Sequence, residues 1–77
     1  MKLHQLAKGQ RGRIVEVGAA GDDLADKLRE LGLTEGDEVE LVAHGPIGGQ
    51  PIAVRLNRTL IALRRAEAEA VSVALDP

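Results

Sequence analysis

The fold is decided by residues 28–39, which read LRELGLTEGDEV. Leu28 and Leu31 continue an apolar helical stripe. Gly32 stands where a helix commonly ends, because glycine enters the left-handed backbone region without a Cβ penalty. Leu33 follows at the position whose apolar side chain folds back onto such a helix end. A further glycine and an alternating segment come next. The stretch therefore predicts a helix that ends, turns and continues into a strand.

The helix itself extends back from this stretch toward the N-terminus. Asp22 or Asp23 can cap it, because a short carboxylate accepts hydrogen bonds from the free N–H groups of the first turn. Leu24, Leu28 and Leu31 recur at i, i+4 and i+7, which places them on one side of a helix. We expect this side to face the core.

Short alternating segments around the helix predict β-strands. In the first of them, Val15 and Val17 are expected to share one face, with Ile14 on the other. Asn57 and Arg58 form a candidate two-residue hairpin turn, since asparagine tolerates a positive φ angle. We expect strands at 13–17, 37–44, 52–56, 59–64 and 71–75, and one helical turn at 66–69.

Five short strands with closely spaced turns favour a closed or nearly closed barrel, a form in which closure removes exposed strand edges. The predicted helix falls between the first and second strands. An OB-like barrel, the alternative fold, carries its helix between the third and fourth strands. We therefore expect a mainly β, SH3-like five-stranded barrel with one inserted α-helix between strands 1 and 2. A short helical turn precedes strand 5, and residues 1–77 form a single domain.

The composition limits what such a domain can bind. The chain has 77 residues, with 10 Lys and Arg against 12 Asp and Glu, no cysteine and 0% aromatic residues. The near balance of charge argues against nucleic acid and anionic membrane surfaces, and the lack of aromatic rings removes the usual platform for stacking bases. No apolar run approaches the ~20 residues that span a bilayer. We expect a cytoplasmic protein with an aliphatic core and no direct membrane insertion.

No catalytic set emerges from the polar residues. His4 and His44 lie far apart in the sequence, and each is either a surface residue or part of a metal site. Ser72 is the only serine and has no neighbouring base to activate it. The carboxylates at the helix start are explained more simply by capping and solvation than by a metal. We expect no catalytic residue, no cofactor and no metal site.

Two surface features leave alternatives open. The segment 45–51 is expected to be the longest irregular loop, and it lacks the ending of a phosphate-binding loop. Its Pro46 and Ile47 either meet Leu24 in an apolar groove for a partner, or Ile47 plugs one end of the barrel. A cluster of arginines is either a patch for phosphate or an acidic partner, or a set of solvated strand positions. Its members are Arg55, Arg58, Arg64 and Arg65.

The whole pattern, over about residues 3–75, resembles the FeoA family of small cytoplasmic proteins of bacterial ferrous iron transport. The segments that carry the resemblance are Leu31-Gly32-Leu33 with Gly36 and Val39, Pro51-Ile52-Ala53-Val54, and Ala62-Leu63-Arg64-Arg65 with Glu67-Ala68. The resemblance implies an SH3-like barrel with an inserted helix. It also implies an accessory protein rather than an enzyme, whose partner is FeoB, a membrane-embedded iron transporter with a cytoplasmic GTP-binding domain.

Three functional hypotheses follow. The first is an accessory protein that contacts the transporter through the helix start and the 46–51 loop, with Leu24, Lys27, Pro46, Ile47 and Pro51 as partner-binding residues. The second is a direct divalent-metal sensor or carrier that uses the two histidines and nearby carboxylates. The third, an RNA-binding barrel, is disfavoured by the missing aromatic residues and positive charge. Self-association stays open.

Overall fold

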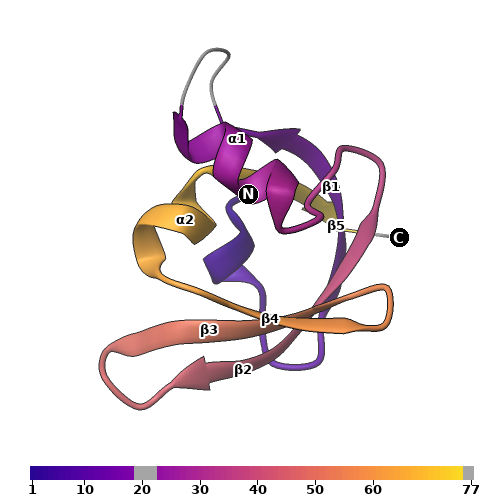
Figure 1. The fold of residues 1–77 in the computed structure, drawn as a ribbon. Helices are drawn as coiled ribbons and strands as arrows, with labels where there is room; N and C mark the ends of the chain where they lie inside the picture. Colours follow the sequence, from indigo (N-terminus) through magenta and orange to yellow (C-terminus); the bar gives the residue numbers. More distant parts are fainter. Residues whose placement is uncertain (19–22, 76–77) are drawn as a thin grey trace.

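The computed structural model describes residues 1–18 and 23–75, which form short helices packed around one bent antiparallel sheet (Figure 1). The elements, in chain order, are the 3-10 helix η1 (Leu3–Gln5), strand β1 (Arg11–Val17), helix α1 (Asp23–Glu30), strand β2 (Glu38–Gly45), strand β3 (Gly49–Leu56), strand β4 (Thr59–Leu63), helix α2 (Arg65–Glu69) and strand β5 (Val71–Leu75). The predicted order of elements is confirmed. The inserted helix lies between β1 and β2, which is not the OB-like arrangement.

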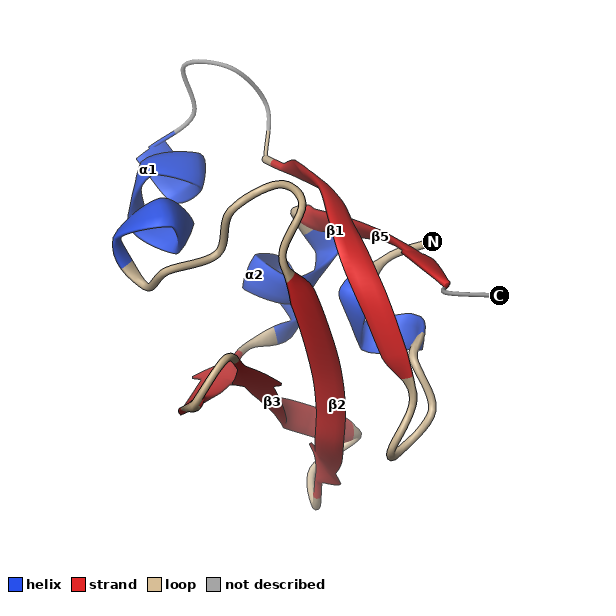
Figure 2. Ribbon diagram, turned by 90° about the vertical axis from the view of Figure 1, so that its right-hand side faces the viewer, coloured by secondary structure: helices blue, strands red, loops and turns tan. Residues whose placement is uncertain are grey.

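The hydrogen-bonded order of the five strands is β4-β3-β2-β1-β5. Figure 2 shows β3 running across the direction of β1 and β2, so the sheet bends around a single core. The edge of β5 is covered by the N-terminus, because Val73 N–H donates to the carbonyl of Met1 at 2.7 Å and the Met1 ammonium donates to the carbonyl of Val73 at 3.1 Å. β4 is the last strand at the other end of this order, so within the described residues one of its edges has no neighbouring strand. The expectation that closure removes exposed strand edges is therefore wrong for β4.

The core is built from aliphatic side chains, as the composition predicts. Leu28 of α1, Leu33 after it and Val39 and Leu41 of β2 are all fully buried. Leu3 and Leu6 of the N-terminal segment join the same cluster. Apolar burial is worth roughly 25 cal/mol per Å², so interlocking leucine and valine side chains stabilise this domain without disulfides.

The end of α1 confirms the prediction, made from residues 28–39, that a helix ends at Gly32. Gly32 has φ 103°, in the left-handed region. Its N–H donates to the carbonyl of Arg29 at 3.0 Å, and the N–H of Leu33 donates to the carbonyl of Leu28 at 3.1 Å. These two bonds form a Schellman motif, which satisfies carbonyl groups that the helix end leaves free. Leu33 is fully buried, so the cap also fixes an apolar contact.

The predicted apolar face of α1 is partly wrong. Ala25 and Leu28 are buried, Leu24 is half-buried and Leu31 is 40% exposed. At 100° per residue, Leu31 lies roughly 90° from the centre of the face that Ala25 and Leu28 define. Leu33 occupies the core position instead. Of the two candidate caps, Asp23 is the first helical residue, and Asp22 lies outside the described residues.

The predicted facing of β1 is wrong because the strand contains a bulge. The register between β1 and β5 shifts between Ile14 and Glu16. As a result Ile14 and Val17 are both buried, whereas Val15 is 52% exposed. A bulge inserts one extra residue into a strand and so reverses the alternation of side chains beyond it.

The segment 45–51 is a hairpin rather than a long irregular loop. β2 continues to Gly45, which pairs with Gly49 at the start of β3. An isolated bridge between Ile47 and Gln50 closes the turn. The hairpin predicted at Asn57 and Arg58 is confirmed, because Asn57 has φ 57° and these two residues join β3 to β4.

Candidate interaction site

The described residues line two adjoining hollows between α1, α2 and the ends of β3 and β4. The larger, of about 530 Å³, is lined by Leu24, Lys27, Pro51, Ala62, Arg64, Ala66 and Glu67. The smaller, of about 410 Å³, is lined by Ile47, Gln50, Pro51 and Arg64. Because Pro51 and Arg64 belong to both, the hollows form one continuous surface, which we call the groove. The groove contains four of the five residues predicted for partner binding.

One wall of the groove is held by an ion pair between the helices. The Lys27 Nζ lies 2.9 Å from the Glu67 Oε2, and the side chain of Glu67 is 13% exposed. The other carboxylate oxygen accepts the backbone N–H of Arg64 at 2.8 Å, which caps the start of α2. The hydrogen bond from Lys27, and then that from Arg64, lower the pKa of Glu67. The carboxylate therefore stays charged near neutral pH, and its ion pair with Lys27 links α1 to α2.

Part of the lining of the groove is apolar. Leu24 and Lys27 lie about one turn apart on α1, so the half-buried leucine side chain is beside the ammonium group of the lysine. Pro51 is exposed on β3, at the junction of the two hollows. Exposed apolar side chains in a depression with a polar rim are typical of protein-binding surfaces.

Ile47 does not plug the barrel, so that alternative is wrong. It lies at the tip of the β2–β3 hairpin and is 81% exposed. Its side chain lines the far end of the groove. Pro46, also exposed, belongs to the same hairpin but does not line either hollow. The structure thus brings Leu24 and Ile47 to opposite ends of one surface and leaves Pro46 beside it.

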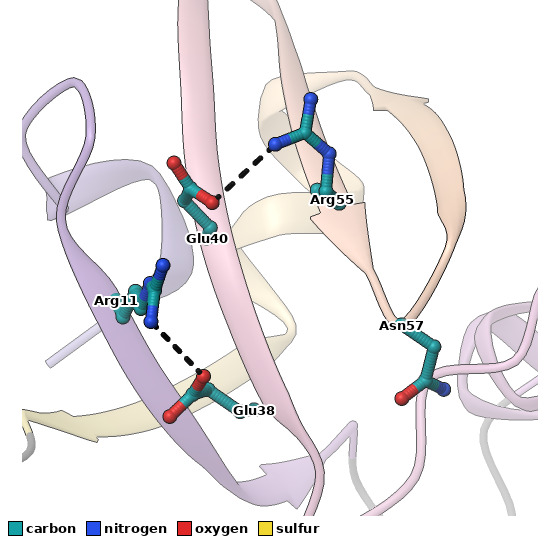
Figure 3. Close-up of a pocket in the computed structure, with 5 residues that line it drawn as sticks. All are labelled: Arg11, Glu38, Glu40, Arg55 and Asn57. Carbon is teal, nitrogen blue, oxygen red and sulfur yellow. Dashed lines mark ion pairs between the residues drawn. The ribbon is translucent and has the colours of Figure 1, made fainter.

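The arginine cluster is divided between separate places. Figure 3 shows Arg55 on the outer face of the sheet in a hollow with alternating charges. Arg55 lies 3.6 Å from Glu40, and Arg11 lies 3.9 Å from Glu38. Asn57 completes this lining. Because each arginine there is matched by a carboxylate, this hollow lacks the excess of positive charge that a phosphate site needs.

The two histidines are closer in space than their sequence positions indicate. The Nε2 of His44 lies 3.4 Å from the backbone carbonyl oxygen of His4. The Nδ1 of His4 is buried and has no hydrogen-bond partner among the described residues. Over residues 1–18 and 23–75, however, no group of three His, Cys, Asp or Glu side chains converges as a metal site would require. Ser72 accepts a hydrogen bond from Lys2 at 3.2 Å.

Comparisons with known proteins decide the family. The model of the FeoA domain matches residues 1–75. The chain belongs to the FeoA family. It is 41% identical to the FeoA of Stenotrophomonas maltophilia, solved as a zinc complex and described as an SH3 domain protein, with a TM-score of 0.82 over 95% of this chain and 88% of that one. FeoA is a small accessory domain implicated in ferrous iron transport rather than a known enzyme family.

Further FeoA structures agree. The iron(II) transport protein A of Clostridium thermocellum is 35% identical, with a TM-score of 0.88 over 97% of this chain and 45% of that one. The FeoA of Chlorobium tepidum is 34% identical, with a TM-score of 0.86 over 100% of this chain and 71% of that one. A manganese-dependent transcriptional repressor at 17% identity and a TM-score of 0.86 shares the fold. Among curated protein sequences, no match to this chain is found.

Sequence reasoning missed part of the groove. Ala62, Ala66 and Glu67 line it, although none was predicted as a binding residue, and Arg64 lines it although it was considered only within the arginine cluster. A signal for one of them exists, because Glu67 follows Arg64 by three residues, the spacing at which a glutamate reaches back to the N-cap backbone. The alanines give no such signal, since their role is to leave space.

Within the described ranges, no helix is long and apolar enough to span a bilayer.

Proposed function

We propose that this FeoA protein is a non-enzymatic accessory protein of bacterial ferrous iron uptake that binds the cytoplasmic GTP-binding region of the FeoB transporter through the groove. Family membership and the S. maltophilia relative, described as a candidate bacterial ferrous iron transport activating factor, support the pathway. The proposal places the protein in the cytoplasm, where that region of the transporter lies.

The groove is the observation that carries this proposal. It joins apolar lining residues, from Leu24 through Pro51 to Ile47, with the charged side chains of Lys27, Arg64 and Glu67. Interfaces of this kind bind through a desolvated apolar centre surrounded by a polar rim. The hairpin tip at Ile47 is suited to insert into a pocket of the partner, because most of its side chain contacts solvent in the free protein.

Retention of the protein on the immobilised cytoplasmic region of FeoB tests the proposal. We expect saturable binding that is weakened at least about tenfold by Leu24→Glu and by Ile47→Glu, since each replaces an apolar lining residue by a charge. Val15→Glu is the matched control, because Val15 is also exposed but lies outside the groove. Absence of binding at high concentration, or equal loss in the control, would contradict the proposal.

The metal-sensor hypothesis is separated from this one by calorimetry. The same protein is titrated with Fe²⁺ under anaerobic conditions and with Zn²⁺. A tight stoichiometric site that His4→Ala or His44→Ala removes would favour direct metal binding. Metal-independent binding to FeoB that both histidine variants retain would support the accessory role.

A further inference from the structure

β4 is the last strand of the sheet, and no strand of residues 1–18 or 23–75 pairs with its outer edge. Leu56 and Thr59 close the two-residue hairpin turn between β3 and β4. In such a turn the closing residues exchange hydrogen bonds, and along an antiparallel pair the bonded and non-bonded positions alternate. The backbone groups of Thr59, Ile61 and Leu63 therefore point toward β3. Those of Leu60 and Ala62 point away from it.

The side chains at this edge are accessible too. Leu60 is 61% exposed, and Ala62 is also exposed. Within the described residues, neither forms a backbone hydrogen bond outside the β3–β4 ladder. Thr59–Leu63 reads TLIAL and contains no proline, charge or bulge, the devices that commonly protect a strand edge. The opposite edge of the sheet, at β5, is covered by Met1.

We propose that the β4 edge binds an extended segment of another protein as an added strand, with alternating apolar residues between acidic ends. The N–H and C=O groups of Leu60 and Ala62 pair with its backbone, and its apolar residues pack beside Leu60. The β4 edge adjoins the groove at Ala62. The proposed binding of an added strand does not require that the groove binds FeoB.

The positive charges at the two ends of β4 favour a segment with acidic ends. Arg58 precedes the strand and Arg64 follows it, both exposed, while Thr59–Leu63 carries no charge. A second copy of β4 is a poor match. The antiparallel register that pairs Leu60 with Ala62 of a copy also brings Arg58, in the turn before β4, near Arg64 of that copy, twice by symmetry. Like charges placed opposite one another destabilise strand pairing, whereas carboxylates at those positions stabilise it.

The test uses the full chain and a blocked, fluorescein-labelled peptide, Glu-Asp-Val-Thr-Val-Thr-Val-Glu-Asp. We expect saturable binding by fluorescence anisotropy, with slowed hydrogen exchange at the amides of Leu60 and Ala62. Ala62→Pro should weaken binding at least about tenfold. Proline is tolerated there because the N–H it removes points away from β3. Ala62→Ser, which keeps that N–H, is the conservative variant at the same position and should bind at least about tenfold more tightly than Ala62→Pro.

Two altered peptides test the mechanism without changing the protein, in case Ala62→Pro unfolds it. N-methylation of alternate amides should abolish binding, and replacement of the acidic residues by lysine should weaken it at least about tenfold. The proposal is overturned if no saturable binding appears up to about 1 mM peptide, or if the N-methylated peptide binds equally well. It is also overturned if sedimentation shows a dimer that Ala62→Pro dissociates, because the occupant would then be a second copy.

Discussion

Lys27 of α1 and Glu67 of α2 form an ion pair of 2.9 Å between residues that are forty positions apart in the sequence. The pair lies on the rim of the groove and is stabilised by the N–H of Arg64, which donates to the same carboxylate. α1 and α2 are thereby joined at the surface proposed to bind the transporter. One carboxylate therefore contacts both α1 and the start of α2 at that surface.

Replacement of Glu67 should therefore be measurable as a loss of stability. Glu67→Gln is expected to lower the free energy of unfolding at pH 7 by up to about 1 kcal/mol through loss of the ion pair with Lys27, because the glutamine oxygen can still accept the N–H of Arg64. Chemical denaturation measures this change. Glu69→Gln, an exposed position in the same helix, is the control and should change stability by less than about 0.5 kcal/mol.

The same pair predicts a pH dependence. The hydrogen bonds from Lys27 and Arg64 lower the pKa of Glu67 in the folded protein. The stabilisation is then fully present above the ordinary pKa of a glutamate and is lost as the pH falls through the lower, folded-state value. The difference in stability between the unchanged protein and Glu67→Gln should shrink as the pH is lowered through this range. A difference that stays constant down to acid pH would contradict this assignment.

The cap of α1 predicts unequal effects for two neighbouring leucines. Leu33→Ala should destabilise the protein by about 2–5 kcal/mol, because a fully buried side chain is removed and leaves a cavity. Leu31→Ala should cost less than about 1 kcal/mol, since Leu31 is 40% exposed. Thermal unfolding of both variants checks the prediction. Equal losses would mean that the helical stripe, and not the cap, packs the core.

Gly18 is a position where a single added methyl group should destabilise the protein. It has φ 66°, and a Cβ there would lie 2.6 Å from the Cβ of Ala25. Gly48 has a similar φ of 64°, but a Cβ there would meet no heavy atom of the described residues within 4 Å. Gly48→Ala should cost about 1 kcal/mol from backbone strain alone, and Gly18→Ala about 1–3 kcal/mol more from overpacking. Denaturation midpoints of the two variants compare these costs directly.

Because of the bulge in β1, substitution by alanine should lower the stability of the protein much more at Ile14 than at the adjacent Val15. Ile14→Ala should destabilise by about 2–5 kcal/mol because Ile14 is buried, while Val15→Ala should cost less than about 1 kcal/mol. Urea denaturation with a constant m-value would show that the effect is on stability alone. A large cost at Val15 and a small one at Ile14 would contradict the register of the bulge.

The sequence indicated most of the local structure because those signals are carried by single residues. Gly32 and Asn57 both adopt the positive φ that their residue types permit, and each is found at the turn predicted from it. Alternation of apolar residues correctly placed β2, β4 and β5 to within a residue or so at each end. The start of β3 was missed because glycine and proline at 49–51 read as a loop, although the backbone there pairs with β2.

The candidate site was predicted in part for a similar reason. Leu24, Lys27, Ile47 and Pro51 stood out as apolar or charged residues near turns, and all four line the groove. The small residues Ala62 and Ala66, which also line the groove, could not be recognised as site residues from the sequence. The proximity of His4 and His44 was also invisible in the sequence, because it arises where η1 packs near the end of β2.

The sequence by itself determined an aliphatic core, the capped end of α1 and the order of the elements, because those features depend on residue type and short-range spacing. Tertiary structure alone decided which side of β1 is buried, which small residues open the groove and which strand edge stays unpaired. These depend on packing and pairing between segments distant in the chain, where a one-residue shift in register exchanges the buried and exposed faces.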